Sequence, residues 1–150
     1  MFPIKKYKKR LIIPYSVGYS YFVTRIFISL KEFDNLWKSI GFGDSELREV
    51  ESFLVIYPQY GKVISGTNGL RKMRWALPGK GKSGGIRILY VDFPVYEVIY
   101  FISIIKKNEK ENISDKDKIS ISQIIISIEN SLRTKYKDGG KKNEKGKRKK

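Results

Sequence analysis

Two stretches in the first half of the chain repeat apolar residues at the helical spacing of three and four. The first stripe consists of Phe33, Leu36, Trp37 and Ile40. The second stripe consists of Leu47, Val50, Phe53, Leu54 and Tyr57. Gly41 follows the first stripe, Asp44 or Ser45 can cap the second, and Pro58 ends it. We therefore predict two helices joined by a short turn, which is an antiparallel helical hairpin.

The apolar period changes to two after the turn-rich residues 61–69. In LRKMRWAL, the apolar residues Met73, Trp75 and Leu77 alternate with Lys72 and Arg74. This alternation predicts a strand with one apolar face and one basic face. A loop, PGKGKSGG, comes next, and IRILYVDF and EVIYFISII predict two further strands. The last strand is almost continuously apolar, which indicates a central place in the sheet.

The remaining segments complete an α+β domain. A β-branched and aromatic stretch predicts a first strand near residues 25–30, and residues 117–136 predict a final helix, although their many isoleucines also suit a strand. The order is then β-α-α-β-β-β-α. We predict two N-terminal helices packed on a mainly antiparallel sheet of about four strands, followed by a C-terminal helix.

The two ends of the chain differ from this central domain in composition. Residues 1–20 are a basic N-terminal extension to which the pattern assigns no structure, and residues 21–137 form the domain. Residues 138–150 are a basic tail without a single apolar residue, so we expect this tail to be disordered.

Charge is concentrated in three windows of this 150-residue chain, which has a formal net charge of +16. Residues 1–10 carry +5, residues 70–90 carry +6 and residues 138–150 carry +5, so these windows account for the whole net charge. Such an excess indicates a polyanionic partner, namely nucleic acid, a ribosome or an anionic membrane face. Only the central window lies inside strongly patterned sequence, and we expect it to be the working surface.

The composition also excludes several kinds of chemistry. The chain has no cysteine and no histidine, which rules out disulfides, thiolate metal sites and the usual general base at neutral pH. No pair of carboxylates has a spacing that suits acid–base or metal chemistry, so we expect neither a metal nor a cofactor. The apolar runs are too short for a membrane span or a signal-peptide core, which makes a cytoplasmic protein the default.

The glycine-rich loop matches two nucleotide-binding motifs by spelling alone. Gly79, Gly81 and Gly84 have the spacing of the dinucleotide fingerprint, and Gly81-Lys82-Ser83 resembles the end of a P-loop. Both motifs require a helix after the loop, because the helix N-terminus binds the phosphate. A strand follows here, so we interpret the segment as a connector between two strands.

The basic strand and its surroundings can form a cationic site for RNA. Lys72 and Arg74 are two residues apart on one strand face, about 7 Å from each other, which suits successive phosphates or one scissile phosphate. Charge alone is enough to bind backbone phosphates. Cleavage is also possible, because RNA carries its own nucleophile, the 2′-OH, and a lysine crowded by other cations can take part in proton transfer. Six further cations are candidates for the same site: Arg71, Lys80, Lys82, Arg87, Lys106 and Lys107.

These segments also resemble a known family. GTNGLRKMRWALPGKGKSGGIRILYVDF, IYFISIIKKNEKENISDKDK and the upstream LWKSIGFGDSELREVESFLVIYPQYGKVI are similar to the HigB-type branch of the RelE/ParE toxin superfamily. The resemblance covers roughly residues 25–135. It implies a RelE-like fold and a toxin of a type II toxin–antitoxin pair. Such toxins cut mRNA in the ribosomal A site, and the cognate antitoxin of this branch usually carries a helix-turn-helix DNA-binding domain.

The resemblance also implies roles for individual residues. Lys72 and Arg74 match the basic pair on the family's second strand, and Arg87 matches the arginine after the glycine turn. Lys107 falls where many members have a basic residue at the end of the last strand. From their charge, and not from the resemblance, we also assign Arg71, Lys80, Lys82 and Lys106 to RNA binding. Relatives with a RelE-type site carry a tyrosine a few residues later, where this chain has Ile113.

Three functions remain open from the sequence. The leading hypothesis is a metal-independent, ribosome-dependent mRNA endoribonuclease that inhibits translation, with Lys72, Arg74, Arg87 and Lys107 as its catalytic residues. The second is a non-catalytic RNA- or partner-binding module, such as a decayed toxin. The third is a ParE-like toxin that poisons gyrase.

Overall fold

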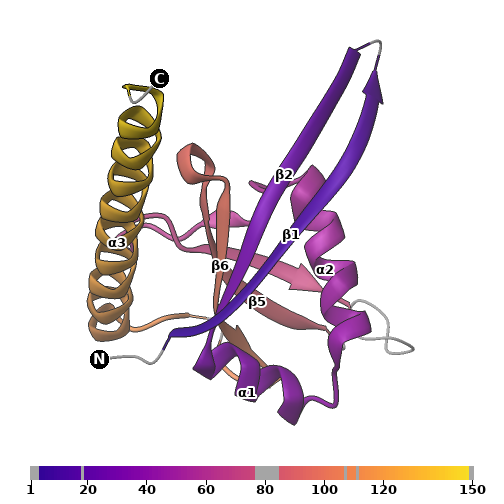
Figure 1. Cartoon of the computed structure of the whole chain (residues 1–150). Coiled ribbons are helices and arrows are strands. Elements are labelled where there is room, and N and C mark those ends of the chain that lie inside the picture. Colours follow the sequence, from indigo (N-terminus) through magenta and orange to yellow (C-terminus); the bar gives the residue numbers. More distant parts are fainter. Residues whose placement is uncertain (1–3, 18, 77–84, 107, 111, 149–150) are drawn as a thin grey trace.

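The computed structural model describes residues 4–17, 19–76, 85–106, 108–110 and 112–148, with side chains described from residue 25 to residue 136 within these ranges. The elements, coloured along the chain in Figure 1, are β1 (Ile4–Val17), β2 (Tyr19–Leu30), α1 (Lys31–Ser39), α2 (Asp44–Ile56), β3 (Lys62–Val63), β4 (Arg71–Trp75), β5 (Ile86–Phe93), the short 3-10 helix η2 (Pro94–Tyr96), β6 (Val98–Ile105) and α3 (Asp115–Arg148). The prediction of an α+β domain is confirmed.

The described strands form one six-stranded sheet with the order β1-β2-β6-β5-β4-β3. The β2–β6 pair is parallel, and the other neighbouring pairs in the described sheet are antiparallel. A mainly antiparallel sheet with β6 inside it is therefore confirmed, whereas the expectation of about four strands is wrong. The two additional strands escape the pattern for different reasons, because β1 lies in the extension left unassigned and β3 is only two residues long.

Residues 4–30 form a long antiparallel hairpin, where the sequence pattern indicated an extension without assigned structure followed by one strand. Tyr15 pairs with Tyr21, and Leu11 pairs with Arg25. Figure 1 shows that the tip of this hairpin projects beyond the rest of the sheet. The β2 end of the hairpin joins the sheet through β6, where Ile26 pairs with Val98. The two predicted helices follow this hairpin directly.

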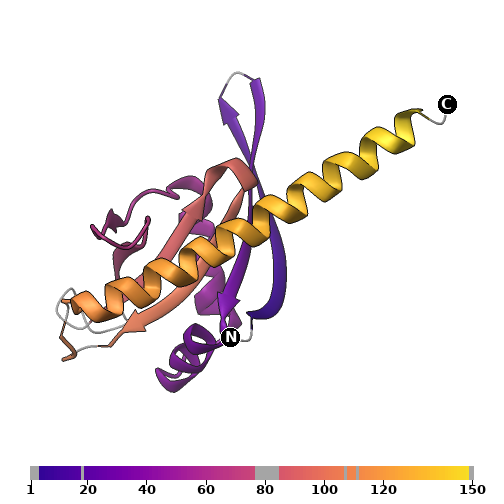
Figure 2. The same cartoon turned by 90° about the vertical axis from the view of Figure 1, so that its left-hand side faces the viewer.

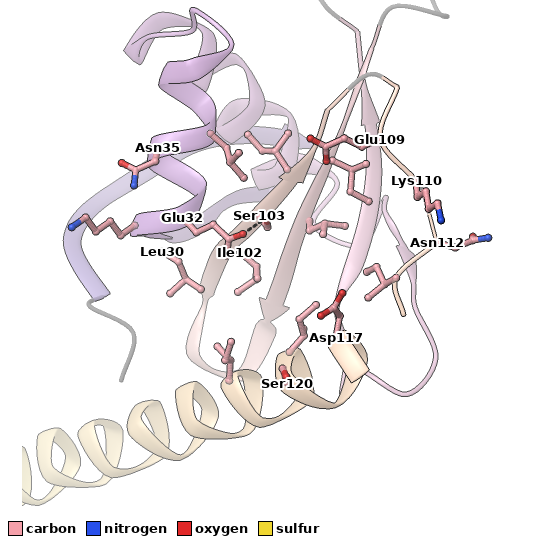
Figure 3. Close-up of a pocket in the computed structure, with 18 residues that line it drawn as sticks. Leu30, Glu32, Asn35, Ile102, Ser103, Glu109, Lys110, Asn112, Asp117 and Ser120 are labelled. Atoms are coloured by element: carbon pink, nitrogen blue, oxygen red, sulfur yellow. Dashed lines mark hydrogen bonds between the residues drawn. The ribbon is translucent and has the colours of Figure 1, made fainter. Parts of the chain in front are cut away.

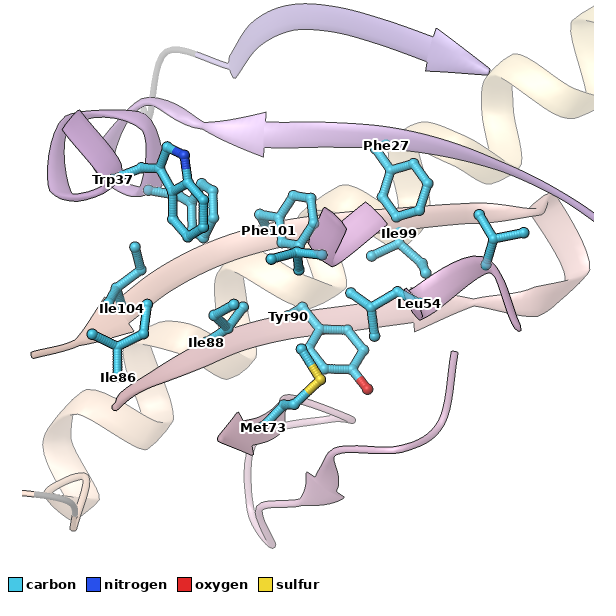
Figure 4. Packing of buried hydrophobic residues seen from close by; sticks show 13 residues of the cluster. Phe27, Trp37, Leu54, Met73, Ile86, Ile88, Tyr90, Ile99, Phe101 and Ile104 are labelled. Atoms are coloured by element: carbon cyan, nitrogen blue, oxygen red, sulfur yellow. The ribbon is translucent and has the colours of Figure 1, made fainter. Parts of the chain in front are cut away.

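The two helices cover one face of the sheet, and aromatic rings fill the space between them. Phe101 of β6 stacks on Phe33 of α1 at a centroid distance of 4.7 Å and on Phe27 of β2 at 5.7 Å. Trp37 stacks on Phe33, and its indole N–H donates to the carbonyl of Gly43 over 3.0 Å. Figure 4 shows the rings of Phe27, Trp37 and Phe101 together with the aliphatic residues of β5 and β6. The predicted helical stripes are confirmed in the buried Phe33, Trp37, Val50 and Leu54.

Tyr57 departs from the predicted stripe of α2. The helix ends at Ile56, and the Tyr57 side chain is 54% exposed. The peptide N–H of Tyr57 still donates to the Phe53 carbonyl, so this residue caps the helix. Its ring lies at the edge of the core, against the ring of Phe53. Pro58 follows and cannot continue the helix, as predicted.

Helix α3 covers the opposite face of the sheet. Its buried residues Ile125 and Ile128 belong to one apolar cluster with Leu89, Val91 and Tyr100 of the sheet. Figure 2 shows α3 crossing in front of the strands and continuing past them towards the C-terminus. The backbone is helical through Arg148, which differs from the disorder expected for residues 138–150. Lysine and glutamate are good helix formers, so a helix that is already nucleated on the sheet can continue through polar sequence.

A buried ion pair joins two strands across β6. The Arg25 guanidinium of β2 donates to the Asp92 carboxylate of β5 over 3.2 Å, and their side chains are 12% and 1% exposed. Burial removes both charges from water, and their mutual attraction offsets this cost only while both partners are present.

We predict that Arg25→Met lowers the free energy of unfolding by about 3–5 kcal/mol, because it leaves the Asp92 carboxylate buried without its cation. Urea unfolding followed by circular dichroism measures the loss. The double variant Arg25→Met/Asp92→Leu is the control and should recover most of the stability. Equal losses in the single and double variants contradict the prediction.

Candidate functional site

The pairing of β4 with β5 brings predicted cations together on the sheet face that α3 partly covers. Arg74 lies directly opposite Arg87, and Lys72 lies directly opposite Leu89. Opposed residues of an antiparallel pair share a face, with Cα atoms about 4.5–5.5 Å apart. Arg74 is exposed, whereas Lys72 and Arg87 are half-buried. We call Lys62, Lys72, Arg74 and Arg87 the basic face.

Lys62 belongs to the basic face, although the sequence pattern did not single it out. It lies in β3 and pairs directly with Lys72. A strand of two residues is too short to show an apolar period, and the residues around it are rich in turn formers. In the sequence, only the positive charge of Lys62, within a stretch that has no acidic residue, indicated that it belongs to the site.

The remaining predicted site residues are placed as follows. Lys106 follows Ile105, which is the register partner of Arg87, and it is half-buried. Lys106 therefore lies just past the end of β6, one residue after the register partner of Arg87. Lys80, Lys82 and Lys107 lie outside the described residues, so their contribution stays a prediction.

Arg71 is directed to the other face of the sheet, and its guanidinium holds a loop. Its Nη1 donates to the carbonyls of Gln59 and Gly61, over 3.2 and 2.7 Å. Tyr90, the register partner of Arg71, donates its hydroxyl hydrogen to the Pro58 carbonyl over 3.0 Å and accepts from the Gly61 N–H over 2.9 Å. Two neighbouring strands thus anchor the segment 57–61. RNA binding by Arg71 stays a prediction, beside a structural role that the sequence did not indicate.

Gly61 is required by this close approach. A Cβ at this position would lie 2.9 Å from Cε1 of Tyr90 and 3.1 Å from the carbonyl oxygen of Lys72. Since both neighbours belong to the packed sheet, a larger residue would push the loop away from β4 and β5.

A pocket of about 810 Å³ lies next to the basic face, between α1, the end of β6 and the start of α3. Figure 3 shows Glu32 and Asn35 of α1 on one side and Asp117 and Ser120 of α3 on the other. Leu89 and Ile105, which oppose Lys72 and Arg87, line its sheet side. The pocket carries charges of both signs, from Lys31, Glu32, Glu109, Lys110 and Asp117. This mixture does not suit a polyanion, so the basic face is the better phosphate site.

Two further observations concern the described part of the chain. Among its residues, no group of three or more histidines, cysteines or acidic residues is placed to hold a metal ion. No helix in the same part combines the length and the apolar character needed to cross a membrane. No model of a known protein family matches the chain.

The stability of the protein at alkaline pH tests the hydrogen bonds through which the Tyr90 hydroxyl holds the 57–61 loop. Burial raises the pKa of Tyr90 above its ordinary value of 10.0. A raised pKa means that the unfolded chain loses this proton first, so the stabilising contribution is complete below pH 10 and is lost as the pH rises through the folded pKa. Tyr100 has a pKa raised by burial as well and contributes in the same direction.

We predict that Tyr90→Phe lowers the free energy of unfolding by about 1–2 kcal/mol at neutral pH, because the Gly61 N–H and the Pro58 carbonyl lose their partner. Above pH 10 the stability of the wild type should fall more steeply than that of the variant. Urea midpoints measured from pH 8 to pH 11 test both statements. Parallel pH profiles for the two proteins contradict the predicted role of the Tyr90 proton.

Proposed function

We propose that the chain is the toxin of a type II toxin–antitoxin system, a ribosome-dependent endoribonuclease that cuts mRNA and thereby inhibits translation. The single observation that carries the proposal is the opposition of Arg74 to Arg87 and of Lys62 to Lys72 on one sheet face. The resemblance of residues 25–135 to HigB-type toxins adds the reaction and the ribosomal setting.

Like charges in directly opposed positions cost stability in an antiparallel sheet. An anion bound between two such pairs lowers this cost. The chain has no acidic residue between Glu51 and Asp92, so β3, β4 and the start of β5 contribute only positive charges to this face. A phosphate backbone supplies one negative charge per nucleotide, which makes RNA a suitable partner.

The chemistry of RNA cleavage needs few protein groups. The 2′-oxygen forms a bond to the adjacent phosphorus, the bond to the 5′-oxygen breaks, and the products carry a 2′,3′-cyclic phosphate and a 5′-hydroxyl. In our proposal Lys72 positions the 2′-OH or accepts its proton, and Arg74 and Arg87 stabilise the charge that develops on the phosphoryl oxygens. Lys107 contacts the phosphate or assists the leaving 5′-oxygen.

The proposed partners follow from the same reaction. mRNA is the substrate and the ribosome holds it. The basic ends of the chain (residues 1–10 and 138–150), together with Lys80, Lys82 and Lys106, bind ribosomal RNA. A cognate antitoxin with a helix-turn-helix DNA-binding domain neutralises the toxin, and the setting is the cytoplasm. No metal or cofactor enters the proposed reaction.

A second candidate function is a non-catalytic RNA-binding module, and the position of Ile113 favours it. Its side chain packs against the apolar cluster beneath α3. It therefore supplies no ionisable group where relatives with a RelE-type site have a tyrosine. This alternative predicts salt-sensitive RNA binding without cleavage.

We predict that expression of the wild type arrests growth of a bacterial host and cuts mRNA on translating ribosomes. Lys72→Ala/Arg87→Ala should restore growth and slow cleavage by at least about 100-fold, because the group assigned to the 2′-OH and one of the two arginines assigned to the phosphoryl oxygens are lost. Mapping of new 5′-hydroxyl ends on mRNA measures the cleavage. Lys38→Ala/Lys116→Ala is the matched control, since it removes two exposed positive charges from helices.

The outcomes separate the candidate functions. Intact mRNA with salt-sensitive RNA binding in the wild type supports the non-catalytic module. DNA damage with intact mRNA supports a gyrase poison. Equal cleavage by the wild type and by Lys72→Ala/Arg87→Ala shows that the reaction does not depend on the basic face.

A further inference from the structure

Four aromatic rings gather at the end of α2, on the sheet face opposite the basic face. Phe53 is at the centre of this cluster. Its ring centroid lies 5.2 Å from that of Tyr57, 5.0 Å from that of Tyr60 and 5.7 Å from that of Trp75. We call Phe53, Tyr57, Tyr60 and Trp75 the aromatic platform.

The two tyrosines of the platform remain largely accessible to solvent. Tyr57 is 54% exposed and Tyr60 is 62% exposed, whereas Phe53 and Trp75 are half-buried. The ring of Tyr60 is nearly perpendicular to that of Phe53, with an interplanar angle of 86°. An edge-to-face contact of this kind covers the face of only one ring, so aromatic surface remains available for another flat group.

The backbone that carries the tyrosines is fixed in place. Arg71 and Tyr90 hold the carbonyls of Pro58, Gln59 and Gly61 through the hydrogen bonds described above. These bonds secure the main chain and leave the rings of Tyr57 and Tyr60 exposed. A surface whose backbone is already ordered loses less conformational entropy when a ligand binds.

One cation lies on the platform side of the sheet. The Arg71 guanidinium donates to the carbonyls of Gln59 and Gly61, the two residues that flank Tyr60. Lys62 is exposed and next to Val63, which pairs with Arg71 on the platform side of the sheet. Flat aromatic groups beside positive charges are the two features with which proteins bind single-stranded nucleic acid, because the bases stack and the phosphates pair with cations.

We propose that the aromatic platform binds bases of single-stranded RNA, with Tyr57 and Tyr60 as the stacking residues. The strand passes over the β3 edge of the sheet, where Lys62 links the platform to the basic face. This inference rests on the proposed function only in taking RNA as the partner, and it does not require cleavage. An acidic protein is the other occupant to be tested, and it has no need of exposed aromatic faces.

We predict that Tyr57→Leu/Tyr60→Leu binds a single-stranded oligonucleotide roughly 5- to 30-fold more weakly than the wild type, since each base that stacks on an aromatic side chain contributes measurably to affinity. The probe is a fluorescein-labelled 2′-O-methyl RNA, which lacks the nucleophile and cannot be cleaved. Fluorescence anisotropy over a range of salt concentrations gives the affinity. The salt dependence should not change, because tyrosine carries no charge.

Two matched variants control for ring chemistry and location. Tyr57→Phe/Tyr60→Phe keeps both rings and should bind like the wild type. Tyr136→Leu removes a tyrosine that is 66% exposed on α3 and should also leave binding unchanged. A 2-aminopurine base in the oligonucleotide reports stacking directly, since its fluorescence should be quenched by the wild type and by the phenylalanine variant.

Unchanged affinity in the leucine variant, or an unquenched 2-aminopurine in the wild-type complex, overturns the inference. Either result means that the aromatic platform binds a protein partner or only covers the hydrophobic core. Ribosomal mRNA cleavage is scored separately in the same proteins. A wild type that binds the oligonucleotide through its tyrosines and cuts no mRNA refutes the proposed function and leaves this inference standing.

Discussion

The fold depends on β6 being apolar on both of its faces. Seven of the eight residues of this strand are buried, and the strand lies between β2 and β5. Its alternate residues belong to two separate cores, so Phe101 packs under α1 while Tyr100 and Ile102 pack under α3. A strand of this kind must be covered on both sides, which requires the helical hairpin and the C-terminal helix to occupy opposite faces.

This arrangement also determines which surfaces remain for binding. The helices cover the middle of the sheet and leave the β3–β4 edge as the region where cations and aromatic rings reach solvent. The side chains of β4 alternate between the two faces of the sheet, so this one strand contributes to both surfaces. Lys72 and Arg74 lie on the α3 side, whereas Arg71, Met73 and Trp75 lie on the α2 side. The proposed phosphate site and the proposed stacking site are therefore the two faces of the same edge.

Hydrogen bonds across this edge fix the position of the basic face relative to the aromatic platform. Arg71 and Tyr90 are register partners, and both hold the loop that carries the exposed tyrosines. The same ladder continues to Arg74 and Arg87. A shift of one residue in the β4–β5 register would move Lys72 and Arg74 from the α3 side to the α2 side of the sheet and would detach the loop. The register is consequently the feature that connects stability to the proposed activity.

The sequence by itself determined the local periods of the chain. It predicted both helices of the hairpin, the strands around Met73, Ile88 and Phe101, and the alternation that separates Lys72 from Met73. These properties depend on neighbours within a few residues, and apolar spacing records them directly. The tertiary structure alone decided the rest, namely the β1–β2 hairpin, the opposition of Arg74 to Arg87, the recruitment of Lys62 and the anchoring of the tyrosine loop. Each of these depends on pairing between residues distant along the chain, which is selected by burial and by the hydrogen-bond ladder and leaves no local period.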